Sequence, residues 1–69
     1  MTQNEKVIKY IDDFGSISTM EAFTELGITR LASRIHEISK TGIPIKRTME
    51  SGKNRYGETV HYARYSRGA

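Results

Sequence analysis

The strongest chemical signal in this 69-residue chain is a set of polar side chains at helical intervals between positions 30 and 40. At 100° per residue they share one face of a helix. An arginine on such a face can donate paired hydrogen bonds to O6 and N7 of guanine, a glutamate can accept one from cytosine N4, and a serine can bond base edges or phosphate. The pattern therefore predicts a helix that enters a nucleic-acid groove through Arg30, Ser33, Arg34, Glu37 and Lys40.

An ordinary solvent-exposed helix carries similar residues, and Arg34 with Glu37 can form a simple surface ion pair. Arg34 lies at one margin of the polar face, and His36 lies at the other. The order of the elements favours the nucleic-acid interpretation, because the helix follows a tight turn and precedes a basic segment. Early residues of such a helix usually reach deepest into the groove. The Thr29 hydroxyl and the free N–H groups at the helix start are expected to hold a phosphate oxygen.

The elements that position this face are predicted from apolar spacing. Leu31, Ile35 and Ile38 form an inward stripe, which predicts a recognition helix over residues 30–41 with Thr29 as its N-cap. A second helix is expected over residues 19–26, opened by a capping box between Ser18 and Glu21. Its inward side chains are Ala22, Phe23 and Leu26, and Gly27 ends it.

A first helix is expected over residues 3–14, with Val7, Ile11 and Phe14 facing the core. The short link at residues 16–18 can supply a strand pair at a sheet edge. After Gly42 the apolar period changes to two, which predicts strands over residues 43–49 and 59–65, joined by a turn over residues 51–58. The expected fold is a single α+β domain over residues 1–69. It is a small winged helix-turn-helix, with three helices followed by a two-stranded antiparallel hairpin, the wing.

Charge is distributed unevenly along the chain. Residues 1–42 hold five basic and six acidic side chains, a net charge of −1, whereas residues 43–69 hold six basic and two acidic side chains, a net charge of +4. A basic end favours a polyanionic partner. Lys53 and Arg55 lie at the expected hairpin tip, where they can reach the DNA backbone or minor groove without reading much sequence. The alternative is a hairpin that charge keeps soluble and protects from edge pairing.

Several kinds of chemistry are not indicated. The two histidines, His36 and His61, lie on different elements with no cysteine partner, so we expect no metal, no cofactor and no catalytic site. We expect no small-molecule substrate, because so short a chain leaves little room for a cleft that excludes water. No apolar run is long enough to span a membrane, and the N-terminus has no signal core, so a cytoplasmic location is expected.

The stretch EAFTELGITRLASRIHEISKTG, followed by KNRYG and VHYARY, resembles a family of small helix-turn-helix proteins common in phages and prophages. Members carry a similar "EAF…LGITRLAARI…L…G" core and an "NRYG…ARY" hairpin. The resemblance covers about residues 16–65. Ser33 stands where alanine is commoner and Ile38 where leucine is usual. The resemblance implies a DNA-binding winged-helix fold in a bacterial host cell, and phage control proteins, excision factors and packaging-associated proteins all use such domains.

The leading hypothesis is a sequence-preferring protein that binds double-stranded DNA as a phage-type transcriptional or recombination regulator. A module this small buries roughly 600–1,000 Å² on DNA, so tight binding calls for a homodimer or several copies. The alternative is a module that engages a host protein. A third possibility is binding of single-stranded nucleic acid by Tyr56, Tyr62 and Tyr65, although tyrosines in a small sheet more often pack in the core or at its edge.

Overall fold

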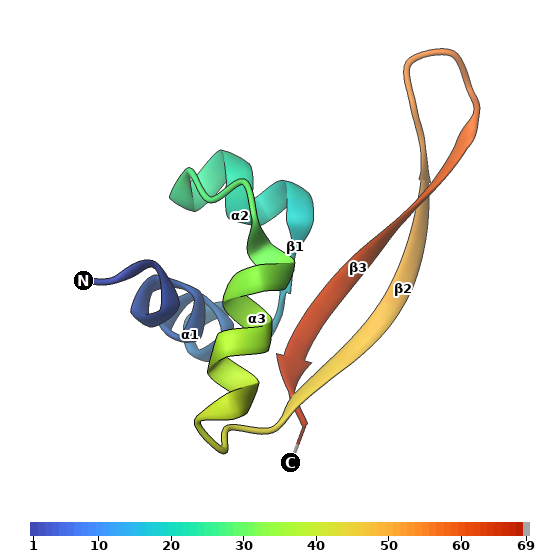
Figure 1. The fold of residues 1–69 in the computed structure, drawn as a ribbon. Helices are drawn as coiled ribbons and strands as arrows, with labels where there is room; N and C mark the ends of the chain where they lie inside the picture. The colour runs from blue at the N-terminus through green and yellow to red at the C-terminus, as the bar shows by residue number, and fades with distance from the viewer. Residues whose placement is uncertain (69) are drawn as a thin grey trace.

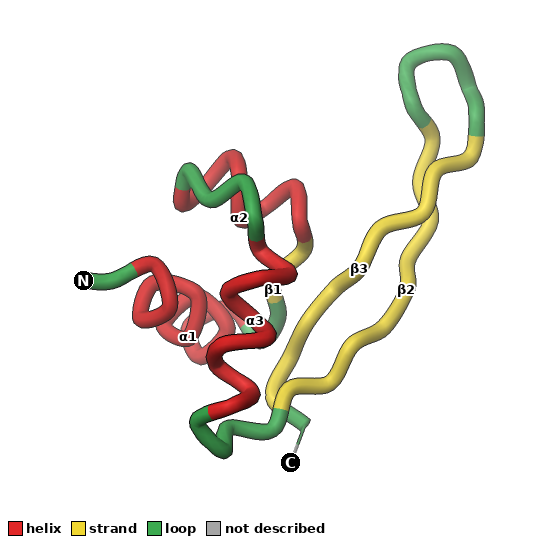
Figure 2. Tube along the Cα trace, in the orientation of Figure 1, coloured by secondary structure: helices red, strands yellow, loops and turns green. Residues whose placement is uncertain are grey.

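The computed structural model describes residues 1–68 and shows three helices packed beside a small antiparallel sheet (Figures 1 and 2). This confirms the predicted α+β winged helix-turn-helix class. In chain order the elements are α1 (Gln3–Phe14), β1 (Ile17–Ser18), α2 (Thr19–Leu26), α3 (Leu31–Lys40), β2 (Ile45–Lys53) and β3 (Thr59–Arg67).

Local hydrogen bonds set where the first two helices begin. The capping box expected at α2 is present: the Glu21 N–H donates to Ser18 Oγ at 3.1 Å, and the Ser18 N–H donates to Glu21 Oε1 at 2.9 Å. A second capping box, which the sequence interpretation missed, joins Thr2 and Glu5 at the start of α1. Each box satisfies two backbone groups that a helix start would otherwise leave unpaired. Gly27 ends α2 in a left-handed conformation with φ of 69°, which glycine adopts without steric cost.

The sheet has the strand order β1-β3-β2, so β3 lies between a two-residue strand and a nine-residue one. The antiparallel β2–β3 ladder runs from the Ile45–Arg67 pair to the Lys53–Thr59 pair. Both strands are longer than the predicted ranges 43–49 and 59–65. Ser51 and Gly52 were expected to break the strand, yet they pair across to β3, because the ladder supplies hydrogen bonds that outweigh their weak strand preference. Figure 1 shows the far half of the hairpin projecting away from the helices.

The core forms where all three helices meet the base of the hairpin. Ile28, in the connection between α2 and α3, is only 2% exposed, so the turn itself contributes to the core. The inward stripe of α3 is buried as predicted. The buried hydrophobic residues are Val7, Ile11, Ile17, Ala22, Ile28, Leu31, Ile35, Ile38 and Tyr65.

Two expected core residues, Phe14 and Phe23, are exposed instead. Phe14 is 71% exposed at the end of α1, where its ring lies against Tyr10 with 4.6 Å between centroids. Phe23 is 57% exposed, because α2 buries only Ala22 completely and turns its other side outward. Met49, within the predicted strand over residues 43–49, is also 56% exposed. A body of three short helices is too small to enclose every apolar side chain.

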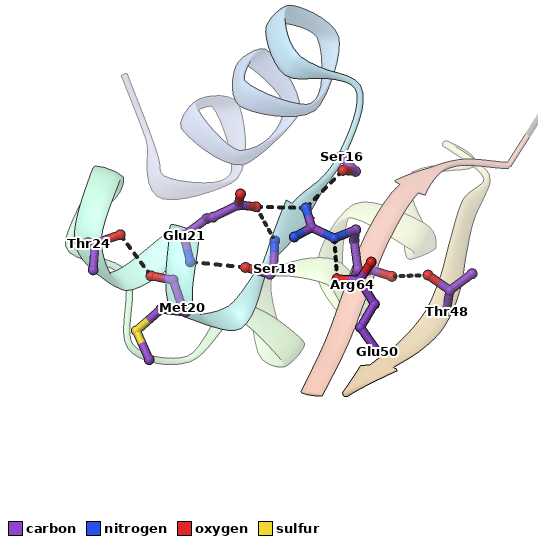
Figure 3. Close-up of polar contacts among 8 residues, drawn as sticks. All are labelled: Ser16, Ser18, Met20, Glu21, Thr24, Thr48, Glu50 and Arg64. Atoms are coloured by element: carbon purple, nitrogen blue, oxygen red, sulfur yellow. Dashed lines mark hydrogen bonds and ion pairs between the residues drawn. The ribbon is translucent and has the colours of Figure 1, made fainter. Parts of the chain in front are cut away.

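Arg64 connects the hairpin to α2 and to the segment before β1 (Figure 3). Its Nε donates to Glu50 Oε1 at 2.7 Å, and its Nη1 donates to Glu21 Oε1 at 2.8 Å and to Ser16 Oγ at 3.0 Å. The hydrogen bond to Glu50 is the main reason that the pKa of Arg64 lies above its ordinary value. This network fixes the hairpin relative to α2, because one guanidinium contacts three separate segments.

These ion pairs predict that acid destabilises the fold. Burial raises the pKa of Glu21, but hydrogen bonds from Ser18 and Arg64 outweigh it and hold the pKa below its ordinary value. A hydrogen bond from Arg67 likewise lowers the pKa of Asp12. A depressed pKa in the folded state contributes stability above the unfolded-state pKa, and this contribution is lost as pH falls through the folded-state pKa. The midpoint temperature of thermal unfolding, followed by circular dichroism, should therefore decrease as the pH is lowered from 7 to 3.

The matched variant for this prediction is Glu21→Gln, which keeps an oxygen that can accept from the Ser18 N–H but removes the charge. It should reduce the drop in midpoint on acidification. The control Glu25→Gln, on the same helix, removes a carboxylate that has no ionic partner within residues 1–68. An equal effect of both variants would contradict the assignment of the acid sensitivity to the Arg64 network.

Candidate nucleic-acid interface

The outward face of α3 presents cationic side chains to solvent, as the sequence pattern predicts. Arg30, Glu37 and Lys40 are exposed, and Ser33 is half-buried. Neither Arg30 nor Lys40 has a carboxylate partner within residues 1–68. Both cations are therefore available to phosphates or base edges.

Arg34 lies in a different environment. Its side chain is 30% exposed, its Nη2 lies 3.1 Å from Glu37 Oε1, and its Nε is buried without a hydrogen-bond partner. A guanidinium that is partly buried and already bonded through one Nη has fewer accessible donors for paired bonds to a guanine than a fully exposed one. Of the two candidate base-reading arginines, Arg30 thus has the more favourable geometry.

The exposed arc of α3 extends further toward one margin than the sequence interpretation places it. Ala32, His36 and Ser39 are all exposed, whereas Arg34 on the opposite margin is half-buried against the body. The packing explains this shift, because α3 contacts both α1 and α2. A helical wheel gives the spacing of residues but not the direction from which neighbours cover the helix. His36 and Ala32 therefore join the residues that can reach a groove.

The start of α3 differs from the prediction. The helix spans Leu31–Lys40, one residue shorter at each end than the expected 30–41. Its N-cap is Arg30, whose side chain makes no capping hydrogen bond, so Thr29 does not serve as the cap. The Thr29 side chain is exposed in the α2–α3 connection and remains available to a phosphate. The first backbone N–H groups of α3 likewise lack a side-chain partner, which favours an anion there.

The hairpin tip is held in a defined shape by one asparagine. Asn54 Oδ1 accepts from the backbone N–H groups of Tyr56 and Glu58, both at 3.0 Å, and Asn54 Nδ2 donates to Glu58 Oε1 at 3.1 Å. Lys53 and Arg55 flank this asparagine, and both are exposed. The Lys53 Nζ donates to Thr59 Oγ1 at 2.7 Å and keeps its charge uncompensated. The tip therefore offers two cations on an ordered loop.

The three hairpin tyrosines have different environments. Tyr65 is 7% exposed and belongs to the core, and Tyr62 is half-buried, in line with the packing role expected of them. Tyr56 is 81% exposed at the tip, so the packing expectation is wrong for this residue. The signal that identifies it is local: Tyr56 lies between the turn-forming Asn54 and Gly57, where a side chain has nothing to pack against.

Two of the cations at the base of the hairpin, Arg64 and Arg67, are paired with carboxylates within the molecule. Arg64 is paired with Glu21 and Glu50, and Arg67 donates two hydrogen bonds to Asp12, at 3.0 and 3.1 Å. The net charge of +4 counted over residues 43–69 is therefore larger than the charge that this part of the folded molecule offers to a partner. Within residues 1–68, exposed cations without a carboxylate partner remain on α3, at the hairpin tip and on β2, where they are Lys46 and Arg47, besides Lys6 on α1.

Two of the predicted site residues border one groove. Thr29 from the α2–α3 connection and Lys53 from β2 line a concavity of about 800 Å³ between α2 and the far half of the hairpin. The other predicted residues, on α3 and at position 55, do not line it. Within residues 1–68, no three or more of His, Cys, Asp and Glu gather where they could hold a metal ion. No helix in the same range is both long and apolar enough to cross a membrane.

Three helices, a solvent-exposed third helix after a tight connection and a basic antiparallel hairpin together define a winged helix-turn-helix protein. Comparison with protein families agrees: the model of a winged helix-turn-helix domain family matches residues 2–67, and the chain belongs to this family. Comparison with curated proteins and with solved structures finds no match. Members of such families are typically DNA-binding modules rather than enzymes, and membership implies binding to double-stranded DNA.

Proposed function

We propose that this domain is a sequence-preferring binder of double-stranded DNA that acts as a small phage-type transcriptional or recombination regulator. In this proposal α3 enters the major groove and the basic wing contacts the adjacent backbone or minor groove. The observation that carries it is the position of the uncompensated cations. Arg30 and Lys40 lie on the exposed side of α3, and Lys53 and Arg55 lie at an ordered tip.

The proposed roles differ between the two elements. Arg30 and Ser33, near the start of α3, read base edges, and Arg34 and Glu37 assist them. The exposed His36 can reach the same groove. Thr29, Lys40, Lys53 and Arg55 hold phosphates, which orient the domain without specifying sequence. Because one domain buries little DNA surface, we propose that two or more copies bind together on DNA.

A salt titration on duplex DNA tests this function. Three phosphate contacts, by Lys40, Lys53 and Arg55, predict a slope of log affinity against log salt of about −2.7. Affinity should then fall roughly 40-fold between 50 and 200 mM salt. Fluorescence anisotropy with duplexes selected from a random pool measures this slope. An affinity that is absent at low salt, or unchanged across the range, would contradict DNA binding and favour the alternative of a protein partner.

A further inference from the structure

The groove between α2 and the hairpin has an apolar interior that neither the core nor the proposed DNA contact uses. Met20 and Phe23 from α2 and Val60 from β3 line it, and these side chains are 67%, 57% and 41% exposed. Its volume of about 800 Å³ lies within the range of about 300–1,000 Å³ typical of ligand sites. Single exposed apolar residues are common on proteins, but several gathered in one concavity indicate a binding surface.

One wall of this groove is an unpaired strand edge. Alternate residues of an antiparallel strand direct their backbone groups to opposite neighbours. Gly68 donates to Pro44 O and Asn54 donates to Glu58 O, so even-numbered residues of β3 face β2 and odd-numbered ones face away. On that other side, β1 pairs only with Arg64 and Tyr65. Within residues 1–68, the backbone groups of Thr59 and His61 on this side thus have no strand partner, and His61 also lines the groove.

β1 cannot continue along this edge, because the chain turns into α2 at Thr19. A strand placed beyond β1 would run antiparallel to β3 and exchange two hydrogen bonds with His61. Its side chains would alternate, with every second one directed toward the apolar wall. Lys53, which has no carboxylate partner in the described chain, also lines the groove. Glu21, the one acidic residue that lines the groove, is already paired with Arg64.

We propose that this groove binds an extended peptide segment of a partner protein by adding a strand to the open edge of β3. The segment carries apolar residues at alternate positions and an aspartate or glutamate that pairs with Lys53. The edge from Thr59 to Ala63 accommodates about five residues, or about 17 Å of strand. This mode combines backbone hydrogen bonds for affinity with side-chain pockets for specificity. It does not depend on the assignment of α3 to DNA, and Lys53 is the one cation that both proposals use.

The two other occupants fit the groove less well. Duplex DNA would present phosphates, which need hydrogen-bond donors and not the side chains of Met20, Phe23 and Val60. A second copy of this chain would bury about five residues of strand on each side, well short of the roughly 1,000 Å² or more expected of a stable interface. The binding experiment distinguishes both of these occupants from a peptide.

Selection from a displayed library of random heptapeptides provides the probe. We expect enriched peptides to alternate apolar and polar residues and to carry Asp or Glu at one end. The most enriched peptide, labelled with fluorescein, is then titrated with the full chain by anisotropy. A copy of it that is N-methylated at alternate backbone amides should bind at least tenfold more weakly, because methylation removes the donors that pair with β3. Failure to enrich such peptides, or equal binding of the methylated copy, would overturn the proposal.

The matched protein variants are His61→Pro and His61→Thr. Proline removes only the N–H that faces the groove and keeps every β2–β3 hydrogen bond, whereas threonine retains the N–H and favours strands. We expect His61→Pro to bind the peptide at least tenfold more weakly than His61→Thr, because only the proline variant lacks the N–H. Phe23→Ser removes an apolar side chain from the opposite wall and should also weaken peptide binding. It tests the proposal if the proline variant does not fold. If duplex DNA or self-association slows hydrogen exchange at the groove amides and the peptide does not, the groove binds DNA or a second copy of the chain instead.

Discussion

Replacement of Leu31 by alanine should lower the free energy of unfolding by about 2–5 kcal/mol, a large part of the total stability of this domain. Leu31 is 2% exposed and begins the inward stripe of α3, so its removal leaves a cavity between helices that cannot fully close. A domain of 69 residues has only about 3–10 kcal/mol of total stability at typical values per residue. The chain contains no cysteine, and so no disulfide can offset the loss.

Urea denaturation followed by far-UV circular dichroism measures this effect. The control is Ser39→Ala on the exposed side of the same helix, which should change the unfolding free energy by less than about 0.5 kcal/mol. A Leu31→Ala protein as stable as the unsubstituted chain would mean that α3 does not pack on the body through this stripe. The exposed face assigned to DNA would then lose its structural basis.

The second large effect is expected at Arg30. Arg30→Ala should lower the discrimination at one base pair by about 1–3 kcal/mol, which corresponds to roughly 5- to 150-fold. The physical reason is that a paired contact to guanine O6 and N7 is lost while the phosphate contacts remain. Competition between the selected duplex and duplexes substituted at single positions measures this loss. Arg30 makes no ion pair within residues 1–68, so the substitution leaves no partner unpaired.

Lys53→Ala is the matched comparison for Arg30→Ala. It should weaken binding to all duplexes similarly and reduce the salt slope by about one, because it removes a phosphate contact at the hairpin tip. Arg34→Ala, assigned to base reading by the helical face alone, should show a smaller change in discrimination than Arg30→Ala. Its guanidinium is already paired with Glu37 and its Nε is buried. Identical behaviour of the three variants would contradict the division into base-reading and phosphate-holding residues.

Features that depend on neighbours in sequence could be predicted from the chain alone. The capping box of α2 joins residues only three apart, and the inward stripe of α3 follows from helical geometry. The presence of a two-stranded hairpin could also be predicted, because alternation of apolar and polar residues indicates a strand. Its length could not be predicted, because Ser51 and Gly52 become strand only through pairing with His61 and Val60.

Features that depend on contacts between distant residues required the tertiary structure. Arg64 meets Glu21 across 43 positions of sequence, and Arg67 meets Asp12 across 55, so no local pattern distinguishes these paired cations from the unpaired ones at the tip. The same holds for the groove, whose walls come from α2 and the hairpin. The residue types and their periodicity determined that one side of α3 would be polar and that the chain would form this fold class. Only the tertiary structure decided which cations remain available and which strand edge stays open, because both depend on how separate elements pack.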